Sequence, residues 1–339
     1  MLAACSGIPL PTDLEQAQSL ERGGNDVAAL GAWRAIRVAC KGPGARPHDD
    51  CGLAAVREAQ LLERMGRDRE AASAWEAVPA LSTTPRSVAR ALVRAAEIHL
   101  EKLGDERGAL ALAWRCVVER AEEEPADNAL ALVVRVERRR DPVALGKHLD
   151  DLAERLRTTD LGDNLLYNAA DLASQLHDGP GAVARFDELV RRWPHSALSD
   201  DANWRAAEIL RRAHDPAGAL ERLARILRTR KDALFVGSYN STLLDDAQLL
   251  TGEILRDDLH DLDRAAEAFT DLADNFPEST LRDDALLDLA LTHLMRHAPP
   301  SANDTSRACA ALARLAREYP EGNRARAGAE LATRTACPR

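Results

Sequence analysis

The sequence has few of the residues that build β-sheets. Aromatic residues make up only 4% of the 339 positions, and no long segment alternates apolar and polar residues as a half-buried strand does. Ala, Leu and Arg are its commonest residues, and all three are strong helix formers. The composition therefore argues against a sheet-based fold and favours an all-α one.

The sequence also lacks the usual marks of membrane spans, nucleic-acid binding and catalysis. No run of 18 apolar residues is present, and a formal net charge of -10 gives no general attraction for phosphate backbones. His293 and His297 have the spacing of two zinc ligands, but Leu294 stands where a metalloprotease carries its glutamate. We therefore expect no catalytic residue, metal site, cofactor or nucleic-acid partner.

The cysteines are few, but their positions suggest two disulfide bonds. Cys40 ends one expected helix and Cys51 opens the next one across a Gly/Pro turn. Cys309 lies early in one helix and Cys337 near the end of the following helix, where antiparallel partners meet. Both separations suit disulfides formed in an oxidising compartment. Cys116 falls within an apolar helix and is expected to be a core thiol.

A repeated pattern fills most of the chain. A small residue, usually alanine, stands four positions before a large one, and the pair recurs roughly every 40 residues. The pairs are Ala29 with Trp33, Ala71 with Trp75, Leu110 with Trp114, Ala144 with His148, Ala182 with Phe186, Ala219 with Leu223, Ala265 with Phe269 and Ala308 with Leu312. Clusters of Gly, Asp and Pro precede most of these helices and predict turns between them.

The clearest copy of this pattern spans Ala265–Leu294, which predicts two helices joined by a turn at Pro277. We expect the second helix to begin at Thr280, with the Thr280 hydroxyl and the Asp283 carboxylate forming a capping box. A single hairpin of this kind cannot bury its apolar face alone, so it needs similar neighbours. The sequence therefore predicts a stack of helical hairpins.

The pattern resembles the tetratricopeptide repeat, whose second helix carries an alanine four positions before an aromatic residue and a proline some eight positions after it. Three helices follow it, the last with leucine in place of the aromatic residue: Phe186 to Pro194, Phe269 to Pro277 and Leu312 to Pro320. The resemblance implies an all-α, right-handed α-solenoid of about eight hairpins with a capping helix over Arg324–Cys337.

We expect three parts along the chain. Residues 1–12 form a tip and tether, residues 13–158 form N-terminal hairpins with a degenerate fourth repeat, and residues 159–339 form C-terminal hairpins and the capping helix.

Two further features resemble the outer-membrane-associated tetratricopeptide lipoproteins of the BamD and CpoB type. The turns Trp193–Ser196, Phe276–Ser279 and Tyr319–Gly322 place a proline directly after an aromatic residue. Met1–Gly7 is similar to a bacterial lipobox, in which Cys5 would carry a lipid. The resemblance implies a non-catalytic interaction scaffold, anchored by lipid to the periplasmic face of the outer membrane and active in envelope or outer-membrane protein assembly. The alternative is a soluble cytoplasmic interaction or regulatory module without an anchor.

The resemblance also implies where a partner would bind. Tetratricopeptide repeats present the first helix of each hairpin to a concave groove, and the variable residues of that helix contact a protein or peptide. The offsets of the family predict these groove residues: Tyr167, Asp171, Asp201, Trp204, Glu208, Arg211, Glu253 and Arg256. Aromatic anchors surrounded by charge are typical of binding hot spots. The alternative is that the charges form ordinary pairs within helices and that Trp204 belongs to the core.

Overall fold

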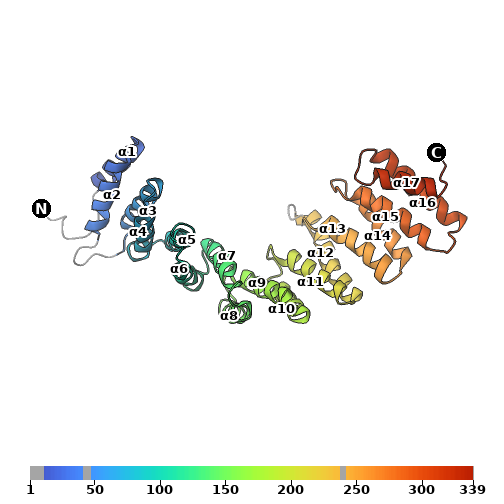
Figure 1. The fold of residues 1–339 in the computed structure, drawn as a ribbon, viewed down its shortest axis with the longest axis horizontal. Coiled ribbons are helices and arrows are strands. Elements are labelled where there is room, and N and C mark those ends of the chain that lie inside the picture. The colour runs from blue at the N-terminus through green and yellow to red at the C-terminus, as the bar shows by residue number, and fades with distance from the viewer. Residues whose placement is uncertain (1–10, 41–46, 237–241, 339) are drawn as a thin grey trace. The chain divides into compact units, whose positions relative to one another are not determined.

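The computed structural model describes residues 11–40, 47–236 and 242–338, and the regular structure in these ranges is helical. The chain divides into two compact units, Met1–Leu172 and Ala173–Arg339. Figure 1 shows the helices following one another along the chain. The prediction of an all-α array of helical hairpins is confirmed.

The N-terminal unit contains eight complete helices and most of a ninth. They are α1 (Pro11–Arg22), α2 (Asp26–Ala39), α3 (Asp49–Arg64), α4 (Asp68–Leu81), α5 (Pro85–Glu101), α6 (Glu106–Glu119), α7 (Pro125–Glu137), α8 (Pro142–Arg155) and α9 (Gly162–Gln175). From α1 to α8 each helix packs on the next, and α5 also packs on α7. Residues that are distant in sequence therefore meet mainly through neighbouring hairpins, as in other repeat proteins.

The C-terminal unit continues the same pattern. Its helices are α10 (Gly179–Arg192), α11 (Ser199–Arg212), α12 (Pro216–Val236), α13 (Leu244–Glu253), α14 (Leu262–Asn275), α15 (Arg282–Met295), α16 (Ala302–Glu318) and α17 (Ala325–Arg334). A π-helical turn, η2 (Ile254–Asp258), directly follows α13. Consecutive helices from α10 to α17 pack on each other. The last helix is shorter than the predicted Arg324–Cys337.

The eight small-and-large pairs of the sequence all fall in even-numbered helices, from α2 to α16. We call these the second helices of the hairpins, and the odd-numbered helices from α1 to α15 the first helices. Most of the paired residues are buried; Trp33, Phe186 and Phe269 are among the largest side chains with almost no exposed surface. The repeat in the sequence is therefore a repeat of core positions.

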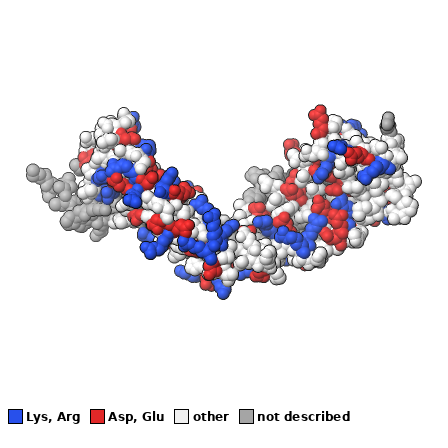
Figure 2. Space-filling view, in the orientation of Figure 1, with Lys and Arg blue, Asp and Glu red and all other residues white. Residues whose placement is uncertain are grey.

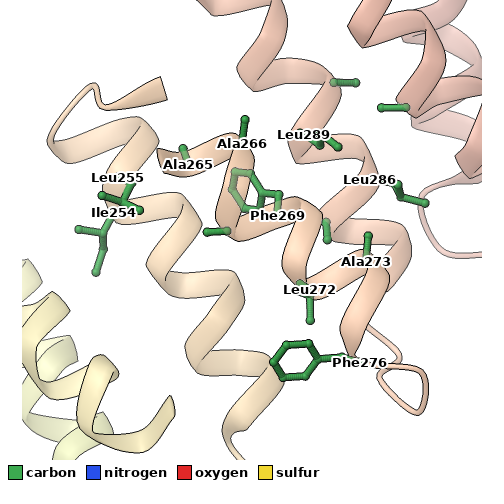
Figure 3. Packing of buried hydrophobic residues seen from close by; sticks show 14 of the residues in the cluster. Ile254, Leu255, Ala265, Ala266, Phe269, Leu272, Ala273, Phe276, Leu286 and Leu289 are labelled. Carbon is green, nitrogen blue, oxygen red and sulfur yellow. The ribbon is translucent and has the colours of Figure 1, made fainter. Parts of the chain in front are cut away.

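Phe269 explains why the first helices need a small residue. The ring lies among Ala266, Leu272 and the neighbouring helices (Figure 3), and it contacts the α-carbon side of Gly252 in α13. A Cβ atom added at Gly252 would lie 2.5 Å from Cε1 of the ring. The glycine is thus required by close approach of the two helices.

Most second helices are capped by the turn residues that the sequence indicated. Asn25, Asp105, Asp141, Asp178 and Asp261 each accept a hydrogen bond from the backbone N–H three positions later. Such caps satisfy amides that the helix itself leaves without partners.

The capping box predicted at Thr280 is wrong. Helix α15 begins at Arg282 after Leu281, which provides no side-chain cap. Asp283 is 4% exposed and accepts a hydrogen bond from the backbone N–H of Arg324, at 3.1 Å. The carboxylate therefore bonds both to the N–H of Asp284, at 3.0 Å, and to the residue that precedes α17, about 40 residues away.

Two disulfide bonds hold loop-linked helices together. Cys40 is bonded to Cys51, with 5.9 Å between the Cα atoms, and Cys309 to Cys337, with 5.3 Å. Cys116 is a buried free thiol, and burial raises its pKa to about 12. These pairs are those expected from the sequence. Cys5 lies outside the described residues.

Candidate functional site

The predicted groove residues of the C-terminal unit lie on three elements. Asp201, Trp204, Glu208 and Arg211 belong to α11, Glu253 ends α13, and Arg256 lies in η2. The other two predicted residues, Tyr167 and Asp171, are half-buried on α9 within the N-terminal unit.

Several of these charges pair with one another between helices. The Arg211 guanidinium donates to Glu253 and to Asp258, each at 2.9 Å. Hydrogen bonds outweigh the opposing effect of burial and raise the Arg211 pKa. Glu253 and Asp258 belong to the next hairpin, so this arginine ties α11 to α13 and η2.

Arg256 extends the series of ion pairs to the following hairpin. It donates to Asp257 at 2.7 Å and to Asp288 of α15 at 2.6 Å, and its guanidinium lies 5.5 Å from the centre of the Phe269 ring. The hydrogen bond to Asp257 is the main cause that raises the Arg256 pKa. These charges contribute to contacts between first helices, which limits their availability to a partner.

Trp204 differs from its charged neighbours. Its indole is half-buried and packs against the hydrophobic core of the C-terminal unit. Asp201 is exposed, and Glu208 lies 3.6 Å from Arg205 of the same helix. Trp204 therefore has one surface in the core and one that a partner can reach.

The N-terminal unit contains a hollow, and none of the predicted groove residues lines it. Its volume is about 770 Å³, and it lies against the first helices α3, α5 and α7, with one tryptophan from α4. It is lined by Gln60, Glu63, Arg64, Trp75, Arg86, Arg90, Val93, Arg94, Glu97, Glu124, Pro125 and Asn128. Both signs of charge occur among these residues, and in Figure 2 basic and acidic side chains are likewise interspersed on the face shown.

One wall of this hollow is fixed by a chain of hydrogen bonds. The Trp75 indole N–H donates to Glu63 at 2.5 Å, and Glu63 also accepts from Nε of Arg94 at 2.9 Å. Arg94 makes a second pair with Glu97 at 2.7 Å. The hydrogen bond to Glu63 is the main cause that raises the Arg94 pKa. These bonds join the second helix α4 to α3, the first helix of the same hairpin, and to α5, the first helix of the next hairpin.

The preceding hairpin repeats this arrangement. The Trp33 indole donates to Glu21 of α1 at 3.1 Å, and Glu21 lies 3.5 Å from Arg64 and 3.8 Å from Arg57 of α3. The tryptophan and the glutamate are 12 positions apart in both hairpins. This shared spacing is a signal that sequence reasoning missed.

The opposite end of the hollow is held less firmly. Arg86 pairs with Glu124 at 3.0 Å, but both side chains are more than 60% exposed. Exposed pairs of this kind contribute between about 0 and 1 kcal/mol. Arg90 is exposed and has no ion pair or hydrogen bond within the described part of the chain. The hollow therefore combines a fixed wall with two available guanidinium groups.

Residues 246–279 and 284–322 match the sequence model of the tetratricopeptide repeat family. These segments of the chain are therefore tetratricopeptide repeats. The matched segments cover α13 to α16, and the remaining hairpins carry the same small-and-large pairs. Among the curated proteins, none matches this chain.

Several solved structures are similar to it. The C-terminal part of a repeat protein from Cytophaga hutchinsonii is 11% identical; the match covers 93% of this chain and 98% of that one, with a TM-score of 0.43. A tetratricopeptide repeat protein from Parabacteroides merdae is 16% identical over 83% of this chain and 97% of its own, with a TM-score of 0.36. The TPR2AB domain of yeast Sti1, in complex with pHSP90, is 15% identical over 72% and 97%, with a TM-score of 0.27.

The described residues contain no group of three or more His, Cys, Asp or Glu side chains placed to hold a metal ion. No helix among them is both long and apolar enough to cross a membrane.

Proposed function

We propose that this protein is a non-catalytic scaffold whose first helices bind an extended segment of a protein partner. The observation that carries the proposal is the hollow against α3, α5 and α7, because it joins the first helices of three consecutive hairpins. Trp75 and Val93, each 6% exposed, form the apolar part of the lining, and the arginines around them supply hydrogen-bond donors.

Trp204 provides the second part of this proposal, on the C-terminal unit. An indole with one surface in the core and one at the surface is a suitable anchor for a partner. We expect Trp204→Ala to weaken partner binding, measured by titration of the partner into the parent protein and into the variant. The helical circular dichroism signal of the variant should fall only modestly. A large fall in melting temperature with unchanged affinity would instead assign Trp204 to the core alone.

We further propose that a lipid on Cys5 anchors the protein to the periplasmic face of a bacterial outer membrane, where it takes part in envelope or outer-membrane protein assembly. The lipobox-like Met1–Gly7 supports the anchor, and the bonded pairs Cys40–Cys51 and Cys309–Cys337 are compatible with an oxidising compartment.

Mass spectrometry of the protein from its native cells tests the anchor. We expect a diacylglyceryl group on Cys5, and we expect Cys5→Ala to move the protein from the membrane to the soluble fraction. In the same sample, Cys116 should be a free thiol, and the pairs Cys40–Cys51 and Cys309–Cys337 should be disulfide-bonded. An unmodified Cys5 together with reduced Cys40 and Cys309 would contradict the proposal and favour a soluble cytoplasmic module.

A further inference from the structure

Helix α5 places three arginines along one face of the hollow in the N-terminal unit. Arg86, Arg90 and Arg94 follow one another at intervals of four residues, so they lie on the same side of the helix. The middle one is the least constrained, because Arg90 makes no ion pair with any described residue, whereas Arg94 is held by Glu63 and Glu97. Two neighbouring cations, Arg90 and Arg86, are thus open or weakly paired.

The spacing of these cations matches an extended peptide. Four residues of α-helix rise about 6 Å. Alternate side chains of an extended strand point to the same side and are about 6.6 to 6.8 Å apart. A strand that runs along α5 can therefore place one carboxylate on Arg90 and another, two residues away, on Arg86.

The other charges of the hollow limit how acidic the ligand can be. Glu63, Glu97 and Glu124 also line it, and Glu63 and Glu97 already bind Arg94. A polymer with a negative charge at every position would meet these glutamates along its length, and like charges at close range are unfavourable. A short segment with two carboxylates avoids most of this repulsion and meets the unpaired Arg90 and the weakly paired Arg86.

We propose that the hollow recognises an internal, extended segment of a protein partner with acidic residues at alternate positions, which bind Arg90 and Arg86. This inference rests on the proposed function and adds the chemical class of the bound segment. Charge-assisted hydrogen bonds from arginine to carboxylate can be bidentate, which would fix the register of the segment. The Arg86 guanidinium exchanges its exposed partner Glu124 for the ligand, at small cost.

Fluorescence anisotropy with the full chain tests the proposal. The probe is a labelled peptide, acetylated and amidated, of the sequence Gly-Ser-Glu-Val-Glu-Ser-Gly. Two further peptides serve as controls, one with Gln-Val-Gln at the centre and one with Glu-Val-Val-Glu. We expect the first peptide to bind at least about fivefold more tightly than the glutamine peptide and about threefold more tightly than the one with wider spacing.

Variants of the chain then locate the site. We expect Arg90→Gln to weaken binding of the acidic peptide about fivefold and Arg86→Gln about threefold. The matched control is Arg107→Gln, because Arg107 is exposed on the second helix α6 and does not line the hollow; its affinity should stay within about twofold of the parent's. Arg90 is exposed and has no ion pair or hydrogen bond with any described residue, so circular dichroism of its variant should equal that of the parent.

Any one of four results would overturn the proposal. The first is equal binding of the acidic and glutamine peptides. The second is equal binding by the parent and Arg90→Gln. The third is binding only when the C-terminus of the acidic peptide is a free carboxylate rather than an amide, since this would show recognition of a chain terminus. Tighter binding of an oligothymidylate, lost in Arg90→Gln, would also overturn it in favour of a phosphate backbone. The Trp204 titration does not depend on Arg90, so it separates failure of this inference from failure of the proposed function.

Discussion

Glu58 offers a direct test of how neighbouring hairpins are held together. This α3 residue is 1% exposed, and it accepts hydrogen bonds from two arginines of α2. Nε of Arg34 lies 2.9 Å from one carboxylate oxygen, and Arg37 binds both oxygens. We therefore expect Glu58→Gln, which keeps the shape but removes the charge, to loosen the contact between α2 and α3.

The size of the effect follows from burial. Removal of one partner of a buried ion pair costs about 3 to 5 kcal/mol, because the other charge loses its compensation. The side chain of Arg34 is 41% exposed and that of Arg37 is 18% exposed, so water replaces part of the lost interaction. We expect the free energy of local opening to fall by about 2 kcal/mol.

Native-state hydrogen exchange measures this quantity helix by helix. A loss of about 2 kcal/mol corresponds to about 30-fold faster exchange of the protected amides in α2 and α3. The control is Glu119→Gln, which removes an exposed pair with Arg115 and should change exchange in α6 less than about twofold. If Glu58→Gln behaved like this control, the view that buried ion pairs join the hairpins would be refuted.

Two other perturbations test the packing and the pH response. Gly252→Ala should lower the melting temperature, because overpacking against Phe269 costs about 1 to 3 kcal/mol and the gain in helix propensity is about 1 kcal/mol; an unchanged value would show that the ring can move aside. Burial opposes charge on His99, but hydrogen bonds to Glu76 at 2.7 Å and Asp105 at 2.9 Å raise its pKa. This stabilisation is complete below the unfolded pKa of about 6.5 and is lost as pH rises through the folded value. As pH rises, amide exchange in α4 to α6 should therefore accelerate by more than the intrinsic pH dependence of exchange. His99→Gln should abolish this additional acceleration.

The fold could be predicted because its repeat consists of core positions. Ala29 with Trp33 and Ala265 with Phe269 mark second helices in the sequence, and burial of the same residues defines the hairpins in the structure. Local turn chemistry predicted most starts of the second helices for the same reason, since a capping carboxylate such as Asp105 acts within four residues. Interactions within one or two turns leave a periodic pattern that the sequence preserves.

The site was harder to predict because its contacts cross between hairpins. Asp283 was expected to form a capping box with Thr280, but its carboxylate binds the backbone N–H groups of Asp284 and of the distant Arg324. Arg211 and Arg256 were predicted to face a ligand, and they also bind acidic residues of the following hairpins. The residue offsets of the repeat family place a side chain on a helix face, but they do not show whether a charged residue of a neighbouring hairpin already binds that side chain.

The hollow of the N-terminal unit shows the same limit. The arginines Arg86, Arg90 and Arg94 stand at helical spacing in the sequence. Their significance depends on Glu63 and Glu124, which come from two other first helices. Arg90 becomes a candidate ligand-binding residue only when the ion pairs of Arg86 and Arg94 are known, because Arg90 is the arginine of this series that has no ion pair with a described residue.

Site-specific photo-crosslinking tests the central claim, that the first helices form the binding face. A photoreactive residue at Asn128, which lines the hollow on α7, should give a covalent product with the partner in native cells. The same residue at Arg107, on the second helix α6, should give none. A product from position 107 with none from position 128 would show that the partner binds the second helices instead.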